Sequence, residues 1–455
     1  MLFLYYVGFA ITLAVAGPFL LLKRKARAGL WQKLGFIPPQ QKGSSAAPAL
    51  KQGGIWFHAV SVGEFNAVKP LIEKVHGEHP DIPLYVSTTT ATGQALAQEK
   101  VGGFATVFYF PFDLPFATGA WLQALKPSLV AVVETELWPG FVDQCHKSGI
   151  KIMTVNGRMS PKSFRTYHRL RFFFKEALLK LDCLCVQSIG EQERFVSIAG
   201  TNDLRVVVTG NMKLDGLSTV SHTAARQLRN ELNLNADDFV IVAGSTHEGE
   251  ESAAIDAFAE LSSLWRERGH QCQPRLIIAP RHPERFQRAC DIVQSKGFSA
   301  KRFSLNEKFE RDNDIYILDG LGQLMKYYSL ASLAFVGGSL APIGGHSLLE
   351  PYAYGVPAIC GPHTYKTRDI ARALNELGAL SQVQTAPELT RKIEQFYLNP
   401  SSIKECGQKG KSWIEENQGA VARTLACVMQ LYDTTSGASA GSTGSTTRES
   451  ISLLR

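Results

Sequence analysis

Residues 128–140 read SLVAVVETELWPG. The first part of this stretch is a nearly continuous apolar run, which is typical of a strand buried on both faces of a sheet. Two glutamates follow the run, and Pro139 suits the first turn of a helix. A buried strand that passes directly into a loop and a helix is the repeating unit of parallel sheets. The stretch therefore predicts an α/β fold whose parallel sheet is covered by helices.

Similar apolar segments alternate with amphipathic ones on both sides of this stretch. The polar segment 212–224 separates two such series and predicts a linker. The simplest account is two doubly wound domains of similar size, 28–214 and 215–433, followed by a low-complexity tail, 434–455, that we expect to be disordered. The expected strands are 55–60, 83–90, 106–112, 128–136, 151–157, 183–188 and 204–211, then 239–245, 275–281, 314–320, 333–339, 357–362 and 379–384.

The N-terminus carries a different signal. Residues 2–22 contain no charged side chain, and Lys23, Arg24, Lys25 and Arg27 follow them. A helix of this length reaches roughly 31 Å, which is the thickness of a bilayer's hydrocarbon core. Because the positive charges follow the apolar run, the pattern favours an anchor (1–27) over a cleavable signal peptide. It predicts a single-pass membrane protein with a cytoplasmic body; a buried core helix is the alternative.

Composition excludes several classes of protein. The 455 residues are 45% hydrophobic and 20% charged, which is globular, and a net charge of +7 is too small to indicate nucleic-acid binding. The eight cysteines include no C-x-x-C pair, so we expect reduced thiols and no structural zinc site.

Carboxylates follow two strands of the first domain. In HAVSVGEF (58–65), Glu64 is expected at the start of a helix, where the helix dipole favours an ionised base. The spacing of Ser61 and Glu64 equally predicts a capping box. After strand 128–136, alternation predicts that Glu134 and Glu136 point to one side, as catalytic groups or as partners of a nearby arginine.

The second domain offers sites for an anion. Arg281, in PRHPER (280–285), follows a strand, although arginines are common in solvated turns. In GGSLAPIGGHSLLEP (337–351), we expect Gly344 and Gly345 to open a helix whose amides bind phosphate. Glu350 would lie well into that helix and accept hydrogen bonds from ribose hydroxyls, unless the segment is an ordinary loop.

The basic and aromatic segment 158–180 has two interpretations. In a membrane-anchored protein it indicates contact with anionic headgroups or with an anionic lipid substrate. A core-packing helix with a solvated basic face is equally consistent with its composition.

Nine short motifs follow one another along the chain: HAVSVGE, STTTATG, FPFD, ETELWP, NGRMS, TGNMK, PRHPERF, GGHSLLEP and GPHT. In this order they resemble the bacterial 3-deoxy-D-manno-oct-2-ulosonic acid (Kdo) transferases of lipid A biosynthesis. The resemblance runs from the apolar N-terminus to about residue 430. It implies a two-domain GT-B glycosyltransferase with a central cleft, which transfers Kdo from CMP-Kdo to the lipid A precursor lipid IVA with inversion. It also implies a location at the cytoplasmic face of the inner membrane.

The resemblance also implies roles for particular residues. Glu64 matches the family's catalytic base, and Glu136 matches an acidic residue of the active centre. Gln323 stands where glutamate is frequent in the family, and Ser347 stands where asparagine is common. The matching CMP contacts are Pro280, Arg281, Gly322, Gln323, Leu324, Ser347, Leu348, Leu349 and Glu350.

The chemistry requires one carboxylate base and groups that balance the charge of one leaving phosphate, so we expect neither a metal ion nor a cofactor. Two alternatives remain: a nucleotide-sugar epimerase with the same two-domain fold, and a non-catalytic membrane adaptor. The number of Kdo residues added, the acyl pattern of the acceptor and the oligomeric state do not follow from the sequence.

Overall fold

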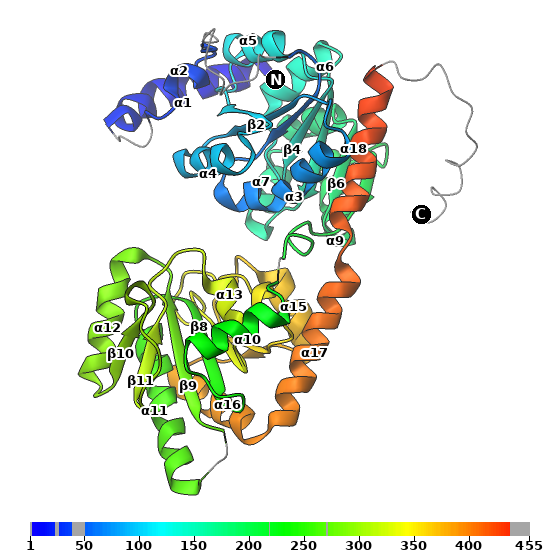
Figure 1. Cartoon of the computed structure of the whole chain (residues 1–455). Helices are drawn as coiled ribbons and strands as arrows, with labels where there is room; N and C mark the ends of the chain where they lie inside the picture. The colour runs from blue at the N-terminus through cyan, green and yellow to red at the C-terminus, as the bar shows by residue number, and fades with distance from the viewer. Residues whose placement is uncertain (1, 23–26, 39–50, 218, 270–271, 437–455) are drawn as a thin grey trace. The chain divides into compact units, whose positions relative to one another are not determined.

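The computed structural model describes residues 2–22, 27–38, 51–217, 219–269 and 272–436. These residues form two compact units, which are described separately (Figure 1). Unit 1 comprises Met1–Gly216 and Gln418–Arg455, and unit 2 comprises Leu217–Asn417. The boundary after Gly216 lies inside the predicted linker, two residues beyond the predicted boundary at 214.

Unit 1 contains a seven-stranded parallel sheet in the order β3-β2-β1-β4-β5-β6-β7. Its strands are apolar on both faces because helices cover both sides, as the sequence predicts. The strands are β1 (Ile55–His58), β2 (Leu84–Thr88), β3 (Thr106–Tyr109), β4 (Leu129–Val133), β5 (Lys151–Gly157), β6 (Cys183–Val186) and β7 (Val206–Val208).

The helices of unit 1 form two layers. Side chains of α3, α4 and α18 pack in one core with Ile55 and Phe57 of β1. Side chains of α5, α6, α8 and α9 pack in the other core with Trp56. The helices are α1 (Leu2–Leu22), α2 (Leu30–Lys33), α3 (Val62–Glu78), α4 (Ala91–Val101), α5 (Pro115–Leu125), α6 (Pro139–Lys147), α7 (Pro161–Arg169), α8 (Arg171–Leu179), α9 (Ile189–Ala199) and α18 (Ala420–Ser436).

Unit 2 repeats the architecture with strand order β10-β11-β9-β8-β12-β13-β14, again parallel. The polar edge strand β10 was not predicted, because its sequence SAKR lacks the apolar run of a buried strand. The strands are β8 (Phe239–Thr246), β9 (Pro274–Pro280), β10 (Ser299–Arg302), β11 (Asp314–Ile317), β12 (Leu333–Val336), β13 (Ala358–Cys360) and β14 (Ser381–Gln382).

Helices cover both faces of this sheet as well. Side chains of α11, α12 and α16 contribute to one core, and side chains of α10 and α13 to the other. The helices of unit 2 are α10 (His222–Glu231), α11 (Glu250–Arg268), α12 (Phe286–Ser295), α13 (Leu324–Tyr328), α14 (Leu349–Tyr352), α15 (Arg368–Glu376), α16 (Ala386–Leu398) and α17 (Pro400–Asn417), with 3-10 turns at Pro283–Arg285 and Phe303–Leu305.

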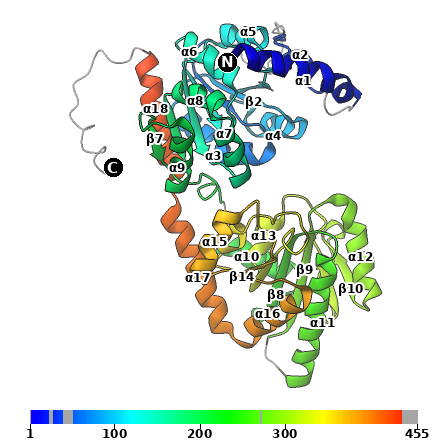
Figure 2. The same ribbon diagram turned by 180° about the vertical axis from the view of Figure 1, so that it is seen from behind.

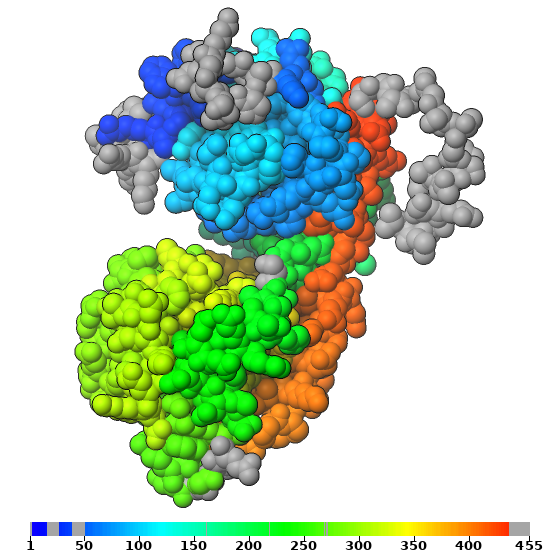
Figure 3. Space-filling model, viewed as in Figure 1, coloured from blue at the N-terminus to red at the C-terminus, as the bar shows by residue number. Residues whose placement is uncertain are grey.

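The C-terminal helix corrects the predicted domain assignment. We expected residues up to 433 to belong to the second domain, but α18 packs against α3 and the sheet of unit 1. Figures 2 and 3 show this helix, in red, along the side of unit 1. The chain returns because Val421, Leu425 and Val428 form an apolar stripe that completes the core beside α3. Residues 434–436 belong to α18, and the rest of the predicted disordered tail lies outside the described residues.

The apolar N-terminal segment forms α1. Tyr5 on this helix donates a hydrogen bond of 2.7 Å to Asp113 of unit 1, whereas Phe3, Leu4 and Ile11 are exposed. Within the part of the chain that the structure describes, no helix combines the length and the apolar character needed to cross a membrane.

The basic and aromatic segment 158–180 forms two helices, α7 and α8, instead of one. Phe164, Tyr167 and Phe174 pack against the core of unit 1, as the core-packing interpretation predicts. Phe172 is exposed.

Candidate active site

Two loops of unit 1 meet at the carboxyl edge of its sheet. Strands β1 and β4 are adjacent and parallel, with His58 paired to Val132 in register. The turn after β1 leads into α3 and carries Glu64, and the loop after β4 carries Glu134 and Glu136. The fold brings these three carboxylates close together. Burial is the largest effect that raises the pKa of Glu64, and the negative charges of Glu136 and Glu134 raise it further.

Glu64 takes part in a variant of the predicted capping box, in which its carboxylate accepts from the N–H of Val60, the residue before the N-cap Ser61. Its Oε2 accepts a hydrogen bond of 2.7 Å from the Val60 N–H, and its Oε1 accepts one of 3.1 Å from the Ser61 hydroxyl. Ser61 in turn accepts from the Glu64 N–H at 3.4 Å. Burial raises the pKa of Glu64 to about 7, although the Val60 hydrogen bond opposes this effect. A carboxylate with this pKa is suited to accept a proton near neutral pH.

The conformation of Glu134 differs from the prediction. Strand β4 ends at Val133, and Glu134 has a left-handed backbone with φ of 58°. Strand alternation therefore does not apply to Glu134 and Glu136. The Glu134 carboxylate forms ion pairs with Arg158 at 3.2 Å and with Lys213 at 3.1 Å. The prediction that a glutamate of this loop pairs with a nearby arginine is thus confirmed for Glu134, which two cations hold.

Glu136 is partly buried beside Glu134. Burial raises its pKa, and the charge of Glu134 adds to the effect. Tyr167 of α7 lies near Glu136. Burial raises the pKa of the Tyr167 hydroxyl most, and the charge of Glu136 raises it further. The Tyr167 hydroxyl donates to the Thr135 carbonyl at 3.2 Å, which fixes the loop that carries Glu136.

His58, at the end of β1, is a residue of this edge that the sequence analysis left without a role. Its Nδ1 contacts the Ser87 hydroxyl at 2.9 Å, and its ring stacks on Phe110 with centroids 3.7 Å apart. Burial lowers its pKa to about 3, so the ring is neutral at neutral pH. Its Nε2 is buried without a hydrogen-bond partner among the described residues.

The second group of predicted residues lies at the carboxyl edge of the sheet in unit 2. Arg281 directly follows β9, which pairs with β8. Burial raises the pKa of Glu350, whereas a hydrogen bond from Ser347 and then the charge of Arg281 lower it. The structure therefore brings Pro280 and Arg281 together with the segment Ser347–Glu350.

Helix α13 places the remaining predicted residues on this edge. Leu324 begins the helix, after Gly322, whose φ of 78° is left-handed, and Gln323. A Cβ atom on Gly244 of β8 would lie 3.1 Å from Leu324 Cδ2 and 2.1 Å from the Tyr328 hydroxyl. The close packing of α13 against the end of β8 therefore depends on a glycine at this position.

Two details of the glycine-rich loop were predicted wrongly. Gly344 and Gly345 do not open a helix, because α14 begins at Leu349. Both have positive φ values, of 106° and 79°, and the Gly345 N–H donates to the Gly338 carbonyl at 2.6 Å. Glu350 consequently lies in the first turn of α14 and not well into a helix.

Glu250, at the start of α11, was missed by the sequence analysis. It is 1% exposed, and its carboxylate fills the concave row of amides that follows β12. This carboxylate holds the loop in place and already occupies an anion site of the kind that a glycine-rich turn offers. Its donors are the backbone N–H groups of Gly338 at 2.7 Å, Ser339 at 3.0 Å, Leu340 at 2.9 Å, Ala341 at 3.1 Å and His247 at 2.9 Å.

A pair of histidines lies beside Arg281 and was also missed. The Nε2 atoms of His247 and His346 are 2.9 Å apart, so one nitrogen donates and the other accepts. Burial lowers the pKa of His346 to about 4, and the charges of His247 and Arg281 add to the effect. Two neutral rings that share a hydrogen bond therefore form part of this edge.

Comparisons with known proteins identify the family. A family model described as 3-deoxy-D-manno-octulosonic-acid transferase (kdotransferase) matches residues 28–216. A 3-deoxy-D-manno-octulosonic acid transferase of Haemophilus influenzae is 31% identical over 401 residues, which are 88% of this chain and 90% of the relative. The chain belongs to the 3-deoxy-D-manno-octulosonic acid transferase family. It is a glycosyltransferase, as the resemblance implied.

Other relatives agree with this assignment. The transferase of the same description from Bordetella pertussis is 31% identical over 415 residues, which are 89% of this chain and 93% of the relative.

The UDP-GlcNAc 2-epimerase of Neisseria meningitidis, crystallised with UDP-GlcNAc, superposes with a TM-score of 0.56, covering 84% of this chain and 100% of that chain. At 13% identity the likeness concerns the fold alone. The transferase therefore has the predicted pair of parallel-sheet α/β domains, which resemble those of GT-B glycosyltransferases.

Proposed function

We propose that this transferase moves Kdo from CMP-Kdo to the lipid A precursor lipid IVA with inversion, and that Glu64 is the catalytic base. The observation that carries the proposal is the position of Glu64. It follows a buried parallel strand, lies in the first turn of α3, and has a pKa raised to about 7 by burial. In doubly wound folds, the carboxyl edge of the sheet is where ligands bind.

The capping bonds of Glu64 are compatible with this role. An ionised carboxylate has about four lone-pair sites on its two oxygens. The Val60 N–H and the Ser61 hydroxyl use two of these sites. The bonds fix the orientation of the carboxylate and leave sites that can receive the proton of an acceptor hydroxyl. The same contacts thus serve the fold and hold the base in one geometry.

In the proposed reaction, an oxygen of the lipid acceptor attacks the anomeric carbon of Kdo as the bond from that carbon to the CMP phosphate oxygen breaks. The attacking hydroxyl gives its proton to Glu64, and CMP leaves with the bonding electron pair. Glu136, raised in pKa by burial and by Glu134, lies beside Glu64 in the active centre. A single displacement of this kind inverts the configuration at the anomeric carbon.

Unit 2 supplies the donor side of the proposal. Arg281 offers a positive charge to the phosphate of CMP, and Glu350 offers a carboxylate to the ribose hydroxyls. Arg281 and Glu350 are close enough for the arginine charge to lower the Glu350 pKa against the larger effect of burial. The further contacts in the proposal are Pro280, Gly322, Gln323, Leu324, Ser347, Leu348 and Leu349. Arg281 and backbone amides balance the charge of the leaving phosphate, so the proposal requires no metal ion.

We also propose that the transferase works at the cytoplasmic face of the inner membrane and is held there through α1. The exposed side chains of this helix include Phe3, Leu4, Val7, Ile11 and Val15. Lys23, Arg24, Lys25 and Arg27, which follow in the sequence, suit anionic headgroups. A helix with an exposed apolar face next to positive charges is a typical membrane-associating element.

The test is an assay with CMP-Kdo and lipid IVA, followed by mass spectrometry of the lipid. We expect the wild type to increase the acceptor mass by whole Kdo residues, and Glu64→Gln to lower the turnover by about 10²–10⁴-fold. Glu73→Gln is the matched control, because Glu73 lies on the same helix and forms a solvent-exposed ion pair with Lys69 at 2.7 Å. Turnover by Glu64→Gln at the wild-type rate would contradict the assignment of Glu64 as the base. Conversion of CMP-Kdo with no increase in the mass of the lipid would favour the epimerase.

A further inference from the structure

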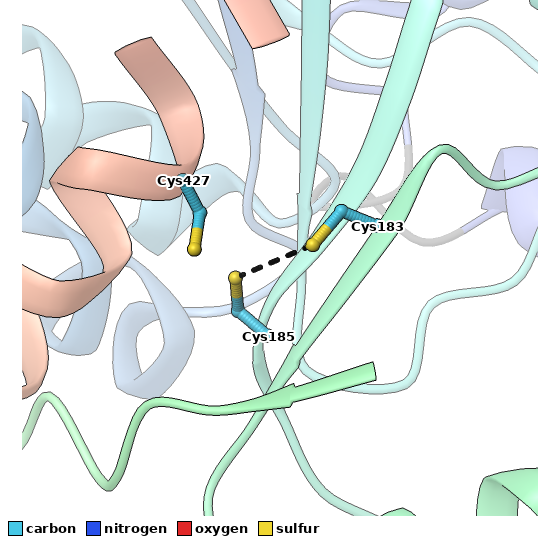
Figure 4. A group of neighbouring side chains, drawn as sticks. All are labelled: Cys183, Cys185 and Cys427. Atoms are coloured by element: carbon cyan, nitrogen blue, oxygen red, sulfur yellow. Dashed lines mark hydrogen bonds between the residues drawn. The ribbon is translucent and has the colours of Figure 1, made fainter. Parts of the chain in front are cut away.

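Three cysteine side chains converge between the sheet of unit 1 and its C-terminal helix. Cys183 and Cys185 lie two residues apart on β6 and therefore point to the same face of the sheet. Cys427 comes from α18. Figure 4 shows the three side chains turned toward one another. Their sulfur atoms all lie within 4.8 Å of one another, and the Sγ atoms of Cys183 and Cys185 are 4.0 Å apart.

All three side chains belong to an apolar core. Cys183 and Cys185 are 0% exposed and Cys427 is 7% exposed. A single buried cysteine is a small apolar residue and needs no further explanation. Three thiols from two elements that meet at one point form a set of ligand atoms of the kind that binds soft metal ions.

The distances fit one ion with three sulfur ligands. A metal–sulfur bond is about 2.3 Å long, so three sulfur atoms arranged in a plane around one ion lie about 4.0 Å apart. The Cys183–Cys185 separation of 4.0 Å matches this value, and no separation in the set exceeds 4.8 Å, which is less than 1 Å above it.

The number of ligands distinguishes between soft ions. Structural zinc sites are almost always four-coordinate, and the described part of the chain supplies three metal-binding groups at this point. Copper(I) is selected by soft thiolate ligands and accepts three of them. A cation also lies nearby, because the Arg205 guanidinium donates a hydrogen bond to Gln430, which is three residues after Cys427 on α18. Its charge partly offsets the negative charge of a thiolate site.

We propose that Cys183, Cys185 and Cys427 bind one copper(I) ion, which fastens α18 to the sheet of unit 1. Binding forms three copper–sulfur bonds and releases the three thiol protons to the solvent, and no electron is transferred because copper enters as copper(I). Since α18 begins where the chain returns from unit 2, the ion would fix the end of the crossing segment to unit 1. The site is separate from the carboxylates at the carboxyl edge and does not depend on the proposed reaction.

The experiment uses the full chain under anaerobic conditions with copper(I) supplied as its bicinchoninate complex. We expect one copper(I) per chain, a sulfur-to-copper charge-transfer band in the ultraviolet, and X-ray absorption that reports three sulfur neighbours. Copper(I) should also raise the unfolding temperature. Cys427→Ala should weaken binding at least 100-fold and lose this thermal shift. Cys145→Ala is the matched control, because this cysteine is also 0% exposed in unit 1 but belongs to the other core.

Two results would overturn the proposal. The first is no transfer of copper(I) to the wild type, whether the protein is incubated in its native state or refolded from urea with the complex present. The second is equal binding by Cys427→Ala and Cys145→Ala. The count of sulfur neighbours in the wild type keeps the proposal testable if Cys427→Ala fails to fold, since a count other than three also refutes it.

Discussion

Replacing Glu64 by glutamine should make the protein more stable at alkaline pH while it removes activity. Burial raises the pKa of Glu64 from 4.5 to about 7, so the native state loses stability relative to the unfolded state as the pH rises from 4.5 to about 7, and the loss is complete above pH 7. The difference, at about 1.4 kcal/mol per pH unit, corresponds to at most about 3.5 kcal/mol. Glutamine has the same shape, and its amide oxygen can still accept from the Val60 N–H, but it carries no charge.

The difference in stability between the wild type and Glu64→Gln depends on pH. Below pH 4.5 the carboxyl group is protonated in both the native and the unfolded state, so wild type and Glu64→Gln should be equally stable. Between pH 4.5 and 7, the carboxyl group is ionised in the unfolded state but still protonated in the native state. The free energy of unfolding of the wild type therefore falls as the pH rises through this range, whereas that of the variant does not. At pH 8 a gain of about 3 kcal/mol corresponds to a rise of roughly 6–12 °C in the unfolding temperature of a unit of this size.

The assay is differential scanning calorimetry of wild type, Glu64→Gln and Glu73→Gln at pH 5 and pH 8, alongside the turnover with CMP-Kdo and lipid IVA. We expect the thermal gain to be large at pH 8 and small at pH 5, and absent from Glu73→Gln at both. A Glu64→Gln variant that is less stable than the wild type at pH 8 would refute the reasoning. It would mean that the ionised carboxylate acts as a stabilising helix cap.

Three further predictions concern other residues. Glu134→Gln should move the acidic limb of the pH–rate profile to lower pH, because the charge of Glu134 raises the pKa of Glu64; an unchanged profile would argue against this coupling. Arg281→Ala should weaken CMP binding about 10- to 100-fold in calorimetric titration without loss of fold, since it removes one charge-assisted hydrogen bond. Equal affinity would remove Arg281 from the donor site. Glu250→Gln should destabilise unit 2 by at least about 2 kcal/mol and speed hydrogen exchange of the amides at 338–341, because this carboxylate accepts from them; exchange at the wild-type rate would show that the loop holds itself.

The site is predictable from the sequence to different extents in the two units. In unit 1, Glu64 occupies the predicted first turn of α3, because the Ser61-x-x-Glu64 spacing is a local capping signal. Glu134 departs from its prediction because two cations distant in sequence, Arg158 and Lys213, hold it in a left-handed turn.

In unit 2, the sequence places Arg281 correctly at a strand end, but it does not reveal the histidine pair or the role of Glu250. His247 and His346 are 99 residues apart and meet because β8 and β12 are neighbours in the sheet. Glu250 resembles an ordinary acidic residue in the first turn of a helix. Its function as a support for the loop after β12 depends on the same strand order.

The sequence by itself determined the alternation of strands and helices, the change of unit near residue 216 and the glutamate at the start of α3, since each follows from local hydrophobic pattern, capping or turn chemistry. The tertiary structure alone decided the return of α18 to unit 1, the ion pairs of Glu134 and the meeting of Cys427 with β6. These features depend on which strands are neighbours and on which open core a distant apolar stripe can fill. Such contacts join residues up to hundreds of positions apart, and no local pattern encodes them.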